Sequence, residues 1–85
     1  MAKARWYVGA TENPSCEFEV RQTVRPIRES WVYAYGPYSK AAAKRFAREQ
    51  ARRYDAAACL IERGKRTLLR PVAASSLIEH RMRRS

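Results

Sequence analysis

Positively charged side chains recur at a regular spacing near the middle of this chain of 85 residues. Four of them follow at every fourth residue and two neighbours widen the series: Lys40, Lys44, Arg48 and Arg52, with Arg45 and Arg53. At about 100° per residue, an α-helix places such a series in one stripe along its surface. Lys and Arg form charge-assisted hydrogen bonds with phosphate and carboxylate groups. The spacing therefore indicates a surface that binds an anionic partner.

The residues between these cations predict a helix that packs by its other side. They stand at the spacing of a core-facing arc: Ala43, Phe46, Ala47, Gln50, Ala51 and Tyr54. Ser39 suits the N-cap, so we expect a helix from Lys40 to about Asp55. The alternative is a merely solvated face, which usually mixes charges of both signs. Here only Glu49 and Asp55 interrupt six cations.

The charge of the whole chain agrees with this interpretation. Eighteen Lys and Arg oppose eight Asp and Glu, for a formal net charge of +10. Such a charge destabilises a compact state through self-repulsion, so it usually has a use. Nucleic acid, a nucleoprotein complex and an acidic protein surface are the natural partners.

Two further groups of cations are weaker candidates. Arg63, Lys65 and Arg66 surround Gly64 at the tip of a predicted hairpin, where they would reach along a phosphate backbone or simply keep the loop in water. The other group, Arg21, Arg25 and Arg28, is partly neutralised by two nearby glutamates. We include the hairpin tip among the expected binding residues and leave the other group out.

Side chains for catalysis or metal binding are scarce. His80 is the only histidine, Asp55 is the only aspartate, and the chain has no Cys-x-x-Cys motif. Glu17 and Glu19 are two apart on a predicted strand, where solvated positions beside Arg21 are the ordinary interpretation. We therefore expect a protein that is not an enzyme, with no catalytic residue, metal or cofactor.

The order of predicted elements is β-β-β-α-β-β in a single domain, residues 1–85. The pattern predicts strands at 5–10, 17–25, 30–35, 58–62 and 67–72, and a short C-terminal helix from Ser76 through Met82. The breaker Gly36-Pro37 is expected to end the third strand. This order predicts an α+β fold, with the main helix on one face of a small, mostly antiparallel sheet.

The third predicted strand is apolar on both sides. Trp31, Tyr33 and Tyr35 share one side, which we expect to form core under the helix; a platform on which nucleic-acid bases stack is the alternative. Val32 and Ala34 make the other side apolar, so the sheet needs cover on both faces. The C-terminal residues Leu77, Ile78 and Met82, a second copy in a homodimer, or the partner itself would supply it.

The compartment is suggested by what the chain lacks. It has no apolar run of about 18 residues for a membrane span, and its first nine residues lack the apolar core of a signal peptide. We therefore expect a cytoplasmic protein. Cys16 and Cys59 would then be free thiols, with one disulfide between them as the alternative.

Two families resemble this chain. The strands that end in Tyr35-Gly36-Pro37-Tyr38-Ser39, followed by a basic, Ala-rich helix, look like the arm-binding domains of phage-type tyrosine recombinases, over about residues 5–55. Those domains insert a three-stranded sheet into DNA. The resemblance implies DNA binding, but residues 58–85 depart from it, and no recombinase catalytic domain is attached.

The helix that begins at Ser39 and the hairpin over residues 59–72 are similar in layout to anti-CRISPR proteins, the small inhibitors of bacterial immune complexes carried by mobile elements. The similarity rests on size, charge and element order. It implies an inhibitor that binds a CRISPR nucleoprotein effector complex in the bacterial host cell and blocks its path for target DNA. A stand-alone DNA- or RNA-binding regulator is the alternative, and a small structural nucleoprotein component is a third.

Overall fold

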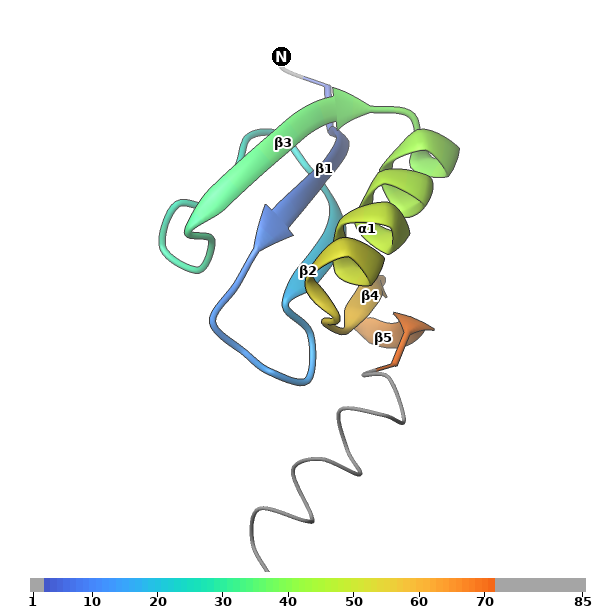
Figure 1. Ribbon diagram of the computed structural model, residues 1–85. Coiled ribbons are helices and arrows are strands. Elements are labelled where there is room, and N and C mark those ends of the chain that lie inside the picture. The colour runs from blue at the N-terminus through green and yellow to red at the C-terminus, as the bar shows by residue number, and fades with distance from the viewer. Residues whose placement is uncertain (1–2, 72–85) are drawn as a thin grey trace, which may run out of the picture.

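The computed structural model describes residues 3–71, which form an α+β fold (Figure 1). The elements are β1 (Arg5–Ala10), β2 (Phe18–Thr23), β3 (Tyr33–Tyr38), α1 (Lys40–Tyr54), β4 (Ala58–Glu62) and β5 (Lys65–Arg70). The expected fold class and element order are confirmed. The expected C-terminal helix from Ser76 through Met82, with its apolar side chains, lies outside the described residues. No helix within residues 3–71 is long and apolar enough to cross a membrane.

One five-stranded sheet carries α1 on a single face, in the order β3-β1-β2-β4-β5. Neighbouring strands are antiparallel except β2 and β4, which run parallel. A parallel pair needs a crossover connection, and here β3 and α1 supply it. As a result, the hairpin formed by β4 and β5 lies along one flank of α1, although it follows the helix in sequence.

The core lies between α1 and the sheet. The helix contributes three buried alanines, Ala43, Ala47 and Ala51, which fit the expected core-facing arc. The strands contribute Val8, Phe18, Val20, Ala58 and Leu60. Small side chains on the helix allow it to approach the sheet closely. One residue of the expected arc differs: Tyr54, in the last turn, is 64% exposed, although its ring stacks on Phe18.

The third strand does not match its predicted bounds. It begins at Tyr33 and continues through Gly36 and Pro37, joined by a cis peptide bond, to Tyr38. The expectation that Gly36-Pro37 ends the strand was therefore wrong. Proline lacks an N–H for the ladder but is tolerated at a sheet edge, and β3 is an edge strand. The pairing of β3 with β1 shifts register at this point.

Trp31 covers the face of the sheet opposite α1. It precedes β3 and is only 6% exposed, and a Cβ atom on Gly9 of β1 would overlap its ring. Tyr35 points the other way and packs against Phe46 of α1. The expected common side of Trp31, Tyr33 and Tyr35 is therefore wrong, since Trp31 lies outside the strand and follows no strand alternation.

A disulfide joins Cys16 to Cys59. The second cysteine lies on β4, the first lies just before β2, and both are buried. The bond therefore links β4 to the segment that leads into β2, its parallel neighbour in the sheet. The prediction that both cysteines are free thiols was therefore wrong, and the alternative of a single disulfide is the one that the structure has.

Candidate cationic interface

The helix that carries the cations is fixed at both ends by its own sequence. The Oγ of Ser39 accepts a hydrogen bond from the backbone N–H of Ala42 at 3.2 Å, as the N-cap prediction requires. At the other end Asp55 adopts a left-handed conformation, with φ 52°, and its backbone N–H bonds to carbonyls of the last turn. The predicted bounds of the helix are confirmed.

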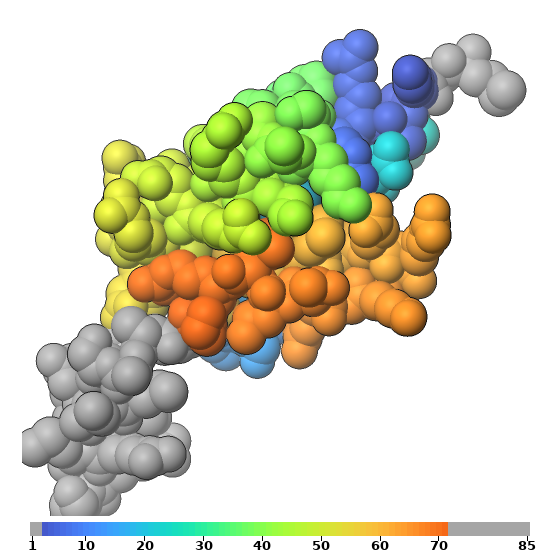
Figure 2. Space-filling view, turned by 90° about the vertical axis from the view of Figure 1, so that its right-hand side faces the viewer, coloured from blue at the N-terminus to red at the C-terminus, as the bar shows by residue number. Residues whose placement is uncertain are grey.

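The two flanks of α1 face different strands. Phe46 packs between Tyr35 and Tyr38, at ring-centroid distances of 4.9 and 5.4 Å, so its flank faces β3. At about 100° per residue, Lys44 and Arg48 lie on the opposite flank, beside the β4–β5 hairpin. Figure 2 views this side of the molecule, where α1 and β5 form one continuous surface.

The helix periodicity also separates the expected stripe into parts. Lys40, Lys44, Arg48 and Arg52 occupy the hairpin flank and its solvent edge, over roughly 120° of arc. Arg45 points away from the sheet. Arg53 lies on the flank of α1 that faces β3, opposite Lys44. Arg45 and Arg53 are both exposed. The six residues therefore do not act as one patch, and four of them share a side with the hairpin.

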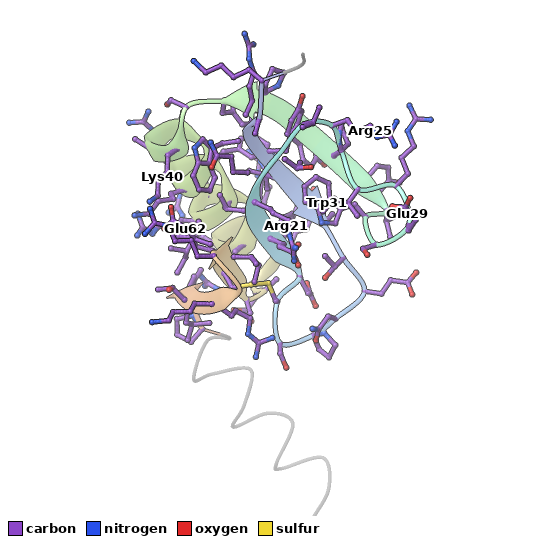
Figure 3. All side chains as sticks on the ribbon, turned by 180° about the vertical axis from the view of Figure 1, so that it is seen from behind. Arg21, Arg25, Glu29, Trp31, Lys40 and Glu62 are labelled. Atoms are coloured by element: carbon purple, nitrogen blue, oxygen red, sulfur yellow. A yellow bond between two sulfur atoms is a disulfide. The ribbon has the colours of Figure 1, made fainter. Side chains whose placement is uncertain are left out.

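Lys40 is engaged within the protein. Its Nζ donates to both carboxylate oxygens of Glu62 on β4, at 2.9 and 3.0 Å, and lies 5.3 Å from the centroid of the Trp6 ring (Figure 3). The hydrogen bond from Lys40 lowers the pKa of Glu62, with smaller contributions from the charges of Lys40, Arg63 and Lys44. Glu62 thus holds the first turn of α1 to the hairpin and has cations around it.

Arg52 is also paired, at the other end of the stripe. Its Nη2 donates to Glu49 Oε1 at 2.8 Å, one helical turn away. This hydrogen bond, together with the charges of Arg52 and Arg53, lowers the pKa of Glu49. An exposed pair of this kind contributes little to stability, and a stronger anion would displace the carboxylate. Arg52 is therefore a secondary member of the interface.

The hairpin tip presents its cations to solvent. The turn residues Arg63 and Gly64 have φ values of 54° and 76°, the positive values that a two-residue type I′ turn requires. Arg63, Lys65 and Arg66 are exposed, but Lys65 and Arg66 belong to β5, so the expected four-residue tip and the expected strand at 67–72 were wrong. Among residues 3–71 no ion pair neutralises them, or Lys44 and Arg48. We name these five residues the helix–hairpin surface: Lys44, Arg48, Arg63, Lys65 and Arg66.

The base-stacking alternative is not supported for Trp31, whereas Tyr33 of the same predicted group is 66% exposed. Trp31 is buried, and its Nε1 lies 3.4 Å from Glu19 Oε1. The same carboxylate oxygen accepts a hydrogen bond from Arg21 Nε at 2.7 Å. Trp31 therefore covers the sheet and offers no free ring face for a base. Arg25 lies on the opposite side of the molecule from Lys40 and Glu62 (Figure 3).

Sequence reasoning missed the acid that organises this interface. The sequence did not predict the pairing of Glu62 with Lys40, because the two residues are 22 apart in sequence. They meet only because the crossover brings β4 beside α1. Its position at the end of an apolar strand, before a basic turn, was the available signal. Within residues 3–71 no group of three or more His, Cys, Asp or Glu lies close enough to hold a metal ion.

Comparison with models of protein families, with curated proteins and with solved structures finds no match to this chain. The function must therefore be argued from the geometry of the helix–hairpin surface and from the chemistry of its side chains.

Proposed function

We propose that this protein is a non-enzymatic binding protein whose helix–hairpin surface holds an anionic macromolecular partner. One observation carries the proposal: two groups of cations that are separate in sequence lie on neighbouring elements, and none of them forms an ion pair within residues 3–71. The Lys40–Glu62 bridge at 2.9 Å joins the elements that bear them. A solvated surface needs no such concentration of one sign.

The working form of the proposal is an inhibitor of a CRISPR nucleoprotein effector complex, which blocks the path of target DNA. Its support is the small size, the net charge of +10 and the element order. An inhibitor of this kind contacts carboxylates or phosphates that the complex holds in fixed positions. Arg and Lys at the helix–hairpin surface suit both groups.

A stand-alone regulator that binds DNA or RNA is the alternative, and a structural nucleoprotein component is the third form. Arg is able to read guanine, but reading adenine relies on Asn or Gln. The helix–hairpin surface contains neither residue, and Gln50 is half-buried on the β3 flank of α1. We therefore expect weak binding to naked duplex DNA without sequence preference, steeply reduced by salt.

The cytoplasm of a bacterial host cell is the proposed place of action. The Cys16–Cys59 disulfide weighs against it, because reducing compartments keep most thiols reduced. Acid quenching of the cells, alkylation of the denatured protein and mass spectrometry would decide the matter, because both cysteines are buried in the folded protein. Two alkylated cysteines are expected in the cytoplasm, and none would indicate an oxidising compartment.

The double variant Lys44→Glu with Arg48→Glu tests the proposal. It should remain folded, because neither side chain belongs to the core. Binding to duplex DNA at low salt should weaken, with the slope of log K against log salt reduced by about 2. Inhibition of target-DNA binding by assembled CRISPR effector complexes should be lost in the same variant.

The matched control is Arg25→Glu with Arg28→Glu. This pair changes the net charge equally, and both residues are exposed on the connection between β2 and β3. If the two double variants lose binding to the same degree, net charge alone is responsible and the helix–hairpin surface is not the site. Tight, sequence-selective binding to naked DNA, with no effect on any effector complex, would replace the inhibitor by the regulator.

A further inference from the structure

The backbone of β5 is open along its outer edge. Its register places Lys65 and Thr67 opposite residues of β4, directly after a two-residue turn. These are the hydrogen-bonded positions of an antiparallel hairpin, so their N–H and C=O groups point toward β4. The corresponding groups of Arg66 and Leu68 then point away from the sheet. Within residues 3–71 no strand pairs with that edge.

The two edges of the sheet differ in their capacity to accept another strand. At the other edge, β3 contains Pro37, which has no N–H, and its ladder is irregular nearby. Proline and irregular pairing are devices that protect an edge. In β5, residues 65–68 contain neither Pro nor Gly and pair with β4 in continuous register. A strand of a partner is therefore able to form backbone hydrogen bonds with the outer edge of β5.

The side chains around this edge define what would fit it. Leu60 of β4 lies in the core beneath α1 and stands opposite Thr67, so Thr67 and Lys65 face the helix side. Lys44 and Arg48 lie on the flank of α1 that faces this hairpin, by the periodicity of the helix. Leu68 faces the other side of the sheet and is 58% exposed. The edge is thus cationic toward α1, and its opposite face carries the apolar Leu68 beside the cation Arg66.

We propose that the β5 edge receives an extended, acidic segment of a partner protein as an additional strand. Acidic side chains of the segment face Lys44, Arg48 and Lys65, and apolar side chains at alternate positions contact Leu68. Backbone hydrogen bonds to Arg66 and Leu68 align the segment. This inference rests on the proposed function for its anionic partner, and it names the partner as protein, because nucleic acid has no backbone ladder to pair.

A second copy of this chain fits the edge poorly. The strand Lys65–Arg70 contains three cations and no acid, so two such strands bring like charges together when they pair. The net charge of +10 opposes the same contact. An acidic strand meets neither obstacle.

Three short peptides of equal charge test the proposal, with fluorescence anisotropy as the readout. The first alternates glutamate and valine. The second has the same composition in two blocks, and the third is the alternating peptide with N-methyl groups along one edge. The alternating peptide should bind at least about tenfold more tightly than the others, because they lose the two-faced pattern or the backbone hydrogen bonds. Equal affinities would overturn the proposal.

Amide hydrogen exchange, followed by NMR, locates the contact. The alternating peptide should slow exchange at Arg66 and Leu68, whereas Lys65 and Thr67 are already bonded to β4 and serve as internal controls. Unchanged exchange at Arg66 and Leu68 would overturn the proposal. Protection that grows with protein concentration in the absence of peptide would assign the edge to a second copy instead.

The variant Leu68→Glu should weaken binding of the alternating peptide by about tenfold, since it opposes an acidic segment and removes the apolar contact. Val32→Glu is the matched control, because Val32 is also exposed and precedes the strand at the opposite edge. Equal losses in both variants would contradict the assignment. If Lys44→Glu with Arg48→Glu abolishes partner binding while the N-methylated peptide still binds fully, the proposed function stands and this inference fails.

Discussion

Removal of the Cys16–Cys59 disulfide should cost the domain a large share of its stability. The bond joins residues 43 apart in sequence, so it closes a loop of that size in the unfolded chain. The loop-entropy relation gives a stabilisation of roughly 4 kcal/mol at 25 °C. A domain of this length has a total free energy of unfolding of about 4 to 13 kcal/mol. Loss of the bond should therefore remove from about a third of that free energy to nearly all of it.

The measurement is thermal unfolding by circular dichroism, with and without a thiol reductant. The reductant should lower the Tm of the wild-type protein by roughly 15 to 30 °C, the shift that such a free energy produces in a small domain. The variant Cys16→Ala with Cys59→Ala should melt near the reduced wild type and should not respond to reductant. A wild-type protein with the same Tm in both conditions would refute the reasoning.

Three further changes test the packing and the interface. Gly9→Ala should destabilise the fold by about 1 to 3 kcal/mol in urea unfolding, because the added methyl group displaces the Trp31 ring; unchanged stability would mean that the ring lies elsewhere. Phe46→Ala should cost about 2 to 3 kcal/mol, less than a fully buried Phe, since its ring is only half-buried; a loss near zero would contradict the assigned flank. Glu62→Gln should strengthen binding to duplex DNA and raise the salt slope by about 1, because it frees Lys40. In the wild type, the hydrogen bond from Lys40 lowers the pKa of Glu62 below its value in the unfolded chain. An NMR titration should therefore show the Lys40–Glu62 ion pair fully formed above the unfolded pKa and lost as the pH falls through the lower pKa of the folded protein.

Local signals in the sequence were sufficient for α1 and β1. Ser39 caps the helix, and the alanines at its core-facing spacing establish its phase. The strand Arg5–Ala10 matches its predicted bounds, and a turn rich in polar residues follows it. In each case the decisive interactions lie within a few residues along the chain, where sequence patterns report them directly.

The bounds of β3 were not predictable in the same way. A Gly-Pro pair interrupts most strands, and it is tolerated here because β3 is an edge strand with an irregular ladder. A strand becomes an edge only through the order of the whole sheet, which no local pattern contains. Trp31 presents the same difficulty, because its burial depends on Gly9, which is distant in sequence and leaves room for the ring.

Only some of the cations that the sequence predicted for the binding site lie together on one surface and are free of ion pairs within residues 3–71. The periodicity of α1 predicted the stripe and is enough to set Arg53 apart from Lys44, but it could not predict that Lys40 forms an ion pair with Glu62. That ion pair follows from the crossover that places β4 along one flank of the helix. The same crossover brings Lys44 and Arg48 beside the hairpin cations, and it leaves the edge of β5 next to them. One topological feature therefore removes a cation from the predicted site, brings others together, and places an open backbone ladder beside them.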